Sequence, residues 1–188
     1  MSKLFISPLA IPGVALVNVK KFSDARGWLM ESYARSHYAA IGIDCEFVQD
    51  NQSMSIHRGT VRGLHLQNPP EPQAKLVRVL KGAIFDVAVD IRKGSPTYGR
   101  WCGATLTADL GEQLFIPHGF AHAFCTLEPY TEVAYKADGY YAPACEAGII
   151  WNDASIGIEW PIATKDAILS AKDARLPSLA EFDSPFRY

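Results

Sequence analysis

Residues 62–67 decide the fold and read Arg62-Gly63-Leu64-His65-Leu66-Gln67. Polar and apolar residues alternate from position 64 to position 67, which is the period of a β-strand. In such a strand the histidine and the glutamine face one side of the sheet, and the two leucines face the other. The glycine has no side chain, so another segment is expected to approach the backbone closely there.

His65 has two interpretations at this stage. Histidine titrates nearest neutral pH, so it can act as a general base in the wall of a pocket. A strand histidine can equally be a structural residue whose ring bonds to the backbone. These six residues alone favour the structural interpretation, so catalysis requires partners from elsewhere in the chain.

Composition indicates a globular protein of one domain. The 188 residues are 48% hydrophobic, and acidic and basic residues are mixed to a formal charge of −2. This balance indicates neither a nucleic-acid nor a membrane partner, and no apolar run approaches the roughly 18 residues of a membrane-spanning helix. The four cysteines lack a C-x-x-C pair, and residues 1–8 are too short and interrupted for a signal peptide. A reduced, cytoplasmic protein is therefore expected.

Most of the chain predicts strands joined by glycine and proline turns. Strands are expected at 14–19, 28–33, 75–80, 83–92, 101–107 and 131–136, with a turn at 22–28 and one short helix over 34–42 that ends at Gly42. The clearest unit is a strand, a tight turn at Lys81-Gly82 and a second strand with Asp86 and Asp90 on one face. The part from Trp151 to Asp173 is less periodic. This pattern predicts an antiparallel sandwich or barrel.

Several polar residues in these segments have both a structural and a functional interpretation. Lys75 shares a strand face with valines, so it lies at an edge or points into a pocket as a cation. His122 can face inward, whereas His118 lies in a turn and is expected to be exposed. The polar run 49–53 is a turn or a surface that binds a polar ligand. Tyr141 lies in an aromatic turn and either packs on the surface or stacks on a flat base.

Two further groups have plain structural explanations. Arg26 and Glu31 flank a predicted strand as an ordinary surface charge pair. Ser170 and Asp173 have the spacing of a helix capping box, although Pro177 would end such a helix almost at once.

The spacing from Gly111 to His122 reads G-x(5)-P-x-G-x(2)-H and resembles the second half of the cupin jelly-roll signature. The first half of a metal-binding cupin needs H-x-H, and Gln67 stands in the place of the second histidine. A three-histidine metal site is therefore not expected. We therefore expect the pocket to work by side-chain acid–base chemistry.

Motifs along nearly the whole chain resemble the dTDP-4-dehydrorhamnose 3,5-epimerase family. They lie in order between about Arg26 and Asp173 and read R-G-L-H-x-Q, K-L-V-R-V, D-V-A-V-D-I-R-x-x-S-P-T-x-G, Q-L-x-I-P-x-G-F-A-H-x-F, Y-K, Y-Y-x-P, W-N-D and L-S-x-K-D. The resemblance implies a mainly β, cupin-type antiparallel jelly-roll barrel with a few short helices. It also implies one domain over residues 1–188, with N-terminal strands and a less regular C-terminal segment. A homodimer that binds a dTDP-sugar and needs no metal or cofactor is expected.

The resemblance also implies the catalytic roles. His65 is similar to the proton acceptor, paired with Asp173, and Tyr135 to the proton donor on the opposite face of the sugar. Lys75 and His122 are similar to the groups around the C4 oxygen. Removing a proton beside a C4 ketone gives an enolate, and a donor at its oxygen is typically worth about 3–4 kcal/mol.

The remaining predicted site residues bind the substrate. Tyr141 resembles the residue that stacks on thymine. The other positions expected to contact the substrate are Arg26, Glu31, Gln49, Asp50, Asn51, Arg62, Glu146 and Lys172. Leu66 and Ala123 depart from the more usual Phe and Gly beside the two histidines, which affects the fine shape of the pocket.

Three other functions remain open from the sequence. A 3-epimerase, a 5-epimerase or a ketoisomerase of dTDP-sugars would use the same scaffold, and one pocket residue can decide between them. A non-catalytic jelly roll that binds a sugar or nucleotide would not need His65, Asp173 and Tyr135 together. A metal-dependent cupin oxygenase is disfavoured by the missing H-x-H motif.

Overall fold

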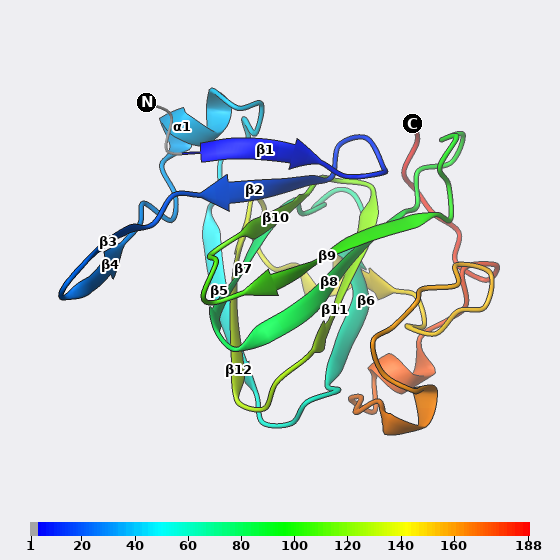
Figure 1. Cartoon of the computed structure of the whole chain (residues 1–188). Helices are drawn as coiled ribbons and strands as arrows, with labels where there is room; N and C mark the ends of the chain where they lie inside the picture. The colour runs from blue at the N-terminus through cyan, green and yellow to red at the C-terminus, as the bar shows by residue number, and fades with distance from the viewer. Residues whose placement is uncertain (1–3) are drawn as a thin grey trace.

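The computed structural model describes residues 4–188, in which two antiparallel sheets form the walls of a barrel (Figure 1). The six-stranded sheet has the order β1 (Leu4–Pro8), β2 (Ala15–Val19), β10 (Gln113–Ile116), β7 (Lys75–Lys81), β12 (Thr131–Ala137) and β5 (Gln49–Ser55). The five-stranded sheet has the order β13 (Glu146–Gly148), β6 (Val61–Gln67), β11 (Phe120–Thr126), β8 (Ala83–Asp90) and β9 (Trp101–Thr107). The predicted mainly β, jelly-roll fold class is confirmed.

The remaining elements are short. β3 (Phe22–Asp24) and β4 (Gly27–Leu29) form a separate hairpin that projects from the barrel (Figure 1). The helices are α1 (Arg35–Ala39), η1 (Pro143–Cys145), η2 (Thr164–Asp166) and η3 (Asp173–Arg175). Within residues 4–188, no helix is long and apolar enough to cross a membrane.

Apolar side chains divide into layers because strand residues alternate between faces. The interior between the sheets is filled by residues such as Val77, Leu114 and Phe124. The outer face of the five-stranded sheet buries Leu64 and Leu66 beneath the C-terminal segment, whose Ile156 and Leu179 belong to the same cluster. The predicted alternation in residues 64–67 is therefore confirmed, and it turns His65 toward the interior.

The turn at Lys81-Gly82 carries the chain from one sheet to the other. β7 pairs with β10 and β12, whereas β8 pairs with β9 and β11, so the two consecutive strands are not a hairpin. Gly82 has a φ of +79°, and a Cβ there would lie 2.5 Å from the Thr131 hydroxyl. The predicted turn is confirmed, and the structure adds that it is a corner of the barrel.

The N-terminal part differs from the prediction in three elements. The expected turn at 22–28 is the β3–β4 hairpin, and the expected strand at 28–33 is regular only as far as Leu29. The helix covers Arg35–Ala39, which is shorter than the expected 34–42. Gly42 nevertheless ends it, because its φ of +90° allows hydrogen bonds from Gly42 N to Ala39 O and from Ile43 N to Tyr38 O.

An irregularity in β6 brings two site residues to the same face. β6 pairs with β11 so that His65 is opposite His122, but Arg62 is opposite Phe124, which leaves one extra residue in β6. Residues three apart in a regular strand face opposite sides, and a bulge reverses this. Arg62 and His65 therefore line the same cavity.

Gly63 lies at this bulge, with a φ of +125°. A Cβ at this position would lie 2.5 Å from both the Ala123 Cβ and the His122 carbonyl oxygen. The predicted close approach of another segment is confirmed, and the segment is β11. A side chain here would push apart the two strands that carry His65 and His122.

Gly63→Ala is expected to lower the free energy of unfolding by about 2–5 kcal/mol, through overpacking plus an unfavourable φ. Gly94→Ala is the matched control, because Gly94 also has a positive φ of +87° but an added Cβ meets nothing within 4 Å. The control should lose only about 1–2 kcal/mol. Urea denaturation of both variants measures the difference, and equal losses would show that the close contact is not what requires glycine.

Candidate active site

A cavity of about 480 Å³ lies between the two sheets and is lined by all four predicted catalytic residues, His65, Lys75, Tyr135 and Asp173. The six-stranded sheet contributes Lys75 and Tyr135, and the five-stranded sheet contributes His65 and His122. The C-terminal segment closes one side with residues 168–170, 172 and 173. Chain segments more than one hundred residues apart in the sequence therefore meet at one site.

His65 and Asp173 form a hydrogen-bonded pair in this cavity. The Nε2 of His65 lies 2.7 Å from the Oδ1 of Asp173, whose side chain is almost fully buried. An ionised carboxylate only accepts, so Nε2 carries the proton and Nδ1 is the free basic nitrogen. Burial lowers the pKa of His65, and this effect outweighs the opposing effect of the Asp173 carboxylate. The ring is therefore uncharged near neutral pH and ready to accept a proton.

The segment that carries Asp173 is attached to the strand that carries His65. Ile168 forms a parallel bridge with Thr60, with hydrogen bonds from Val61 N to Ile168 O and from Ile168 N to Gly59 O. The Ser170 hydroxyl accepts a hydrogen bond of 3.0 Å from the Asp173 backbone N–H. The Ser170 hydroxyl thus makes one bond of the capping-box pattern, although it is not the cap of η3, which begins after Lys172. This bond helps to orient Asp173, which in turn orients His65.

A second histidine–carboxylate pair lies next to the first. The Nε2 of His122 lies 2.7 Å from the Oδ1 of Asp86, and Asp86 is fully buried. The other oxygen of Asp86 has no hydrogen-bond partner among the described residues. The sequence placed Asp86 on the polar face of its strand but did not identify it as a site residue. The sequence signal is only that Asp86 shares a strand face with Asp90, and the fold alone brings Asp86 to His122.

Lys75 is a buried cation in the same group. Burial lowers the pKa of Lys75 to about 8, while the nearby carboxylates of Asp86 and Glu146 raise it. Its ammonium nitrogen lies 5.8 Å from the centre of the Tyr135 ring. An ammonium group with this pKa is charged at neutral pH, so it can stabilise a nearby anion.

Tyr135 projects into the cavity from the sheet opposite His65. β12 places it between Asn51 of β5 and Val77 of β7. Burial raises the pKa of Tyr135, and this outweighs the opposing charge of Arg62. The phenol therefore stays protonated and can donate a proton. A base on one wall and an acid on the other can act on opposite faces of one bound molecule.

Polar groups expected to bind the substrate extend from the cavity toward the 140–146 loop. The Nζ of Lys172 lies 2.5 Å from Glu146, and the Tyr141 hydroxyl donates to Glu146 at 3.1 Å. The Glu146 pKa is lowered chiefly by its bond to Lys172. Gln49 accepts a hydrogen bond from the Tyr141 backbone N–H at 2.8 Å, so Gln49 also belongs to this group.

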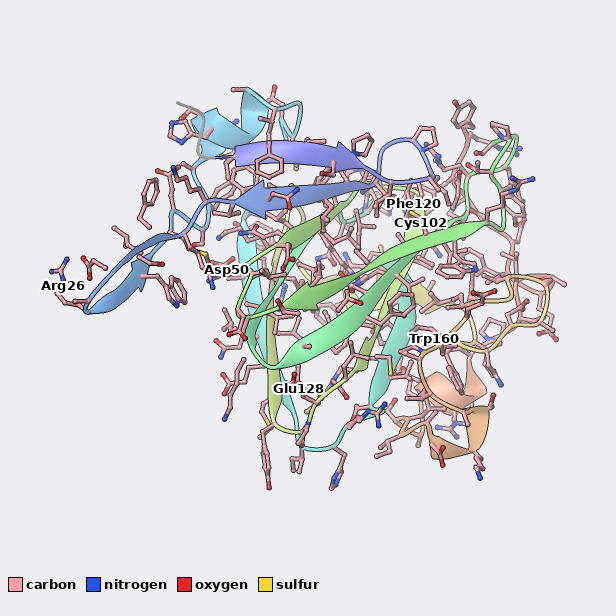
Figure 2. All side chains as sticks on the ribbon, viewed as in Figure 1. Arg26, Asp50, Cys102, Phe120, Glu128 and Trp160 are labelled. Carbon is pink, nitrogen blue, oxygen red and sulfur yellow. The ribbon has the colours of Figure 1, made fainter. Side chains whose placement is uncertain are left out.

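Four of the predicted binding residues, Arg62, Lys75, His122 and Lys172, line the cavity, and the other seven do not. Three of these seven make their side-chain contacts away from it. Asp50 faces the outside of β5 and pairs with Lys136 at 2.8 Å, where it lines a separate groove of about 520 Å³. Arg26 lies at the tip of the projecting hairpin, and its side chain is 90% exposed (Figure 2). Glu31 pairs with His37 at 2.5 Å. Asn51 alternates with Asp50 and therefore faces inward beside Tyr135.

The cavity also contains residues that the sequence did not single out. Ser53, Thr60 and Phe124 line it between the catalytic groups. Ser53 stood within the polar run at 49–53, so alternation could have found it. The complete burial of Asp86 and the placement of the Phe124 ring beside His122 could not be predicted from the sequence, because both depend on the fold.

Fold and site together define a jelly roll in which a histidine–aspartate pair and a tyrosine face one cavity from opposite sheets, an arrangement typical of enzymes that work by acid–base chemistry. The family model for dTDP-4-dehydrorhamnose 3,5-epimerase matches residues 8–181. The chain belongs to this family, and it is an isomerase. The predicted family and enzyme class are therefore confirmed.

Individual relatives cover the chain almost completely. The dTDP-4-dehydrorhamnose 3,5-epimerase of Salmonella typhimurium is 49% identical over 94% of this chain and 96% of that protein. A structure of the dTDP-6-deoxy-D-glucose-3,5-epimerase of Legionella pneumophila, in complex with dTDP-4-keto-L-rhamnose, is 41% identical, covers 98% of each chain and superposes with a TM-score of 0.93. The dTDP-4-dehydrorhamnose 3-epimerase of Streptomyces niveus is 38% identical over 94% of this chain and 84% of that protein.

The absence of a metal and a cofactor stays a prediction. Among residues 4–188, no group of three or more His, Cys, Asp or Glu side chains is arranged to hold a metal ion. Both cavity histidines bind carboxylates instead.

Proposed function

We propose that this protein inverts C3 and C5 of dTDP-4-dehydro-6-deoxy-D-glucose to give dTDP-4-dehydro-L-rhamnose, in dTDP-L-rhamnose biosynthesis. One observation carries the proposal: a neutral histidine held by Asp173 and a protonated tyrosine face one cavity from opposite sheets. Inversion needs a base on one face of a carbon and an acid on the other, which this arrangement supplies.

In the proposed reaction, His65 removes the proton from C3 or C5, and the C–H electron pair moves into the ring to form an enolate at the C4 oxygen. Lys75 stabilises this oxyanion with its ammonium group. His122 adds a second donor when both of its ring nitrogens are protonated, with Nε2 bound to Asp86 and Nδ1 facing the oxyanion. Tyr135 then donates its proton to the carbon from the other face. Solvent returns a proton to Tyr135 and removes one from His65 before the second carbon reacts.

The substrate's nucleotide end would lie toward the 140–146 loop. Tyr141 stacks on thymine, and Arg62 and Lys172 provide positive charge for the diphosphate. Gln49, Asn51 and Glu146 supply hydrogen-bonding groups. Asp50, on the outer face of β5, enters this proposal only as a neighbour of the two inward residues.

The test is proton exchange in heavy water with dTDP-4-keto-6-deoxyglucose, followed by NMR. Deuterium at C3 and C5, with inverted product, is expected. A bound sugar without deuterium would make the site a non-catalytic binding site and overturn the proposal.

The second candidate is inversion of one carbon only. It is favoured by the similarity to the Streptomyces niveus protein, whose name is that of a 3-epimerase. Label and inversion at C3 alone would assign this function. Inversion at both carbons would exclude it, whereas label at C5 without inversion would not, because a base can exchange a proton and return it to the same face.

We further propose that the chain is a single functional domain that acts as a homodimer in the cytoplasm. The six hairpin residues of β3 and β4 are exposed, and the hairpin carries Arg26 away from the cavity of its own chain (Figure 2). Trp28 and Leu29 on the hairpin are 56% and 74% exposed, which a partner chain would cover. Arg26 would then reach the partner's substrate.

Co-expression of two inactive variants tests this arrangement. Chains with Arg26→Ala and chains with His65→Asn would combine into a dimer with one complete site, if Arg26 acts on the partner's cavity. Activity recovered in the mixture supports the dimer. No recovery, with light scattering showing a monomer, would contradict it.

The pH dependence of the reaction should reveal the ionisation of Lys75. The base works when His65 is neutral, above its lowered pKa, and the oxyanion is stabilised while Lys75 is charged, below its pKa of about 8. kcat/KM is therefore expected to fall on the alkaline side near pH 8. Lys75→Met should lose this alkaline decline and lower kcat by about 10²–10³-fold. An unchanged alkaline decline in Lys75→Met would assign it to another group.

A further inference from the structure

Gln67 is a buried glutamine that the proposed mechanism does not use. It lies on the interior face of β6, two residues from His65, and its exposed fraction is only 4%. It is not among the described residues that line the 480 Å³ cavity. A buried amide needs partners for its two protons and its oxygen, so its contacts indicate its role.

All three polar contacts of Gln67 are with backbone groups of loops next to the site. Its Nε2 donates to Glu71 O at 2.7 Å and to Tyr140 O at 3.2 Å. Its Oε1 accepts from Ala142 N at 2.8 Å. Both amide protons are used, so none is free for a substrate.

Gln49 holds the same loop from the opposite sheet. Its Oε1 accepts from Tyr141 N at 2.8 Å, and its Nε2 donates to Asn51 at 3.1 Å. The consecutive N–H groups of Tyr141 and Ala142 therefore bind two glutamine oxygens, one from β5 and one from β6. The backbone on both sides of Tyr141 is fixed to both sheets of the barrel, although its side chain is 55% exposed.

We propose that Gln67 is a positioning residue for nucleotide recognition, which acts by holding the 140–142 backbone so that the Tyr141 ring is presented to the base. This inference rests on the proposed function, because it takes the flat group beside Tyr141 to be the base of a dTDP-sugar. If the loop were not anchored, binding of the base would have to order the loop, and this cost would reduce the favourable free energy of stacking. Because the backbone is already fixed, this cost is not paid on binding.

The geometry predicts different roles for two residues of β6. His65 acts on the sugar carbons, and Gln67 acts on the other end of the substrate through Tyr141. Loss of the Gln67 bonds should therefore raise KM and the Kd for dTDP, while kcat changes little. A contact with the remote base stabilises the bound substrate and the transition state equally. Its loss therefore raises KM and leaves kcat unchanged.

The first experiment measures Gln67→Met, which keeps length but loses all three hydrogen bonds. We expect Kd for dTDP and KM for dTDP-4-keto-6-deoxyglucose to rise about five- to tenfold, as loss of a stacked base contact would give, with kcat within about twofold. With 4-keto-6-deoxyglucose 1-phosphate, which has no base, kcat/KM should be unchanged. Gln52→Met is the matched control, because Gln52 lies on the exposed face of β5 and bonds to Glu132.

A double-mutant cycle with Tyr141→Ala separates positioning from a general structural role. Tyr141→Ala alone should raise the Kd for dTDP about tenfold. In that background, Gln67→Met should raise it by less than about twofold, since the ring through which Gln67 acts is gone. Equal effects in both backgrounds would overturn the inference. If Gln67→Met does not fold, Gln67→Glu keeps the acceptor for Ala142 and loses both donors, and the same cycle applies.

Failure of this inference is distinct from failure of the proposed function. A wild-type protein that epimerises the dTDP-sugar keeps the proposed function, whatever the Gln67 variants do. A lower kcat with unchanged Kd for dTDP would place Gln67 at the reacting sugar and overturn the inference alone. A wild-type protein without epimerase activity, but with dTDP binding that depends on Gln67 through Tyr141, would support the inference and end the proposed function.

Discussion

His65→Asn is expected to abolish most proton exchange and most epimerisation together, with each rate lower by about 10²–10⁴-fold. Both rates require the first proton abstraction, and this variant has no base at that position. Asparagine is too short to replace the bond from His65 Nε2 to Asp173, but the pairing of β6 with β11 and β13 does not depend on the ring, so the cavity walls should keep their places. The Kd for dTDP should stay within about twofold, because the base and diphosphate contacts remain.

The matched control is His118→Asn. His118 pairs with Asp138 in an exposed turn and is not among the described residues that line the cavity. It should keep wild-type exchange and product. Exchange that survives in His65→Asn at more than about a tenth of the wild-type rate would show that another group is the base, since a general base is typically worth at least 10²-fold.

The local pattern predicted which side chains share a face of the sheet, but not which face is the interior, because strand alternation is a property of neighbouring residues. His65 with Gln67, and Asp86 with Asp90, share faces as the period of two requires. Gly63 gave a further local signal, since a missing side chain indicates a close approach. The pattern could not say that β11 is the approaching strand, nor that the resulting bulge turns Arg62 to the same side as His65.

Contacts between distant segments could not be derived from periodicity. Asp173 reaches His65 across 108 positions, and its role was predicted from the L-S-x-K-D motif alone. Asp86 was seen as a polar strand residue, but its bond to His122 depends on how β8 and β11 pair. Arg26 shows the opposite case. Its position in the motif predicted a contact with the substrate, but the fold of its own chain places it away from the cavity.

Tyr135→Phe is expected to separate proton exchange from epimerisation. His65 can still remove a proton, and Lys75 and His122 can still stabilise the enolate, so deuterium should enter the substrate. The ring packing of Tyr135 against the interior cluster is kept, because only the hydroxyl is removed. Inverted product should fall by about 10²–10⁴-fold, since no acid then delivers a proton from the opposite wall.

The measurement is NMR in heavy water, which reads exchange and inversion in one sample. Tyr130→Phe is the matched control, because Tyr130 is 56% exposed in the turn between β11 and β12 and should leave both rates unchanged. If Tyr135→Phe lost exchange and inversion in equal proportion, the phenol would be needed before or during proton removal, for example to orient the sugar or stabilise the enolate. Inversion requires a separate acid, because a base that returns a proton to the carbon, even a deuteron taken from solvent, restores the original configuration. The placement of Tyr135 on the sheet opposite His65 is what makes that acid independent of the base.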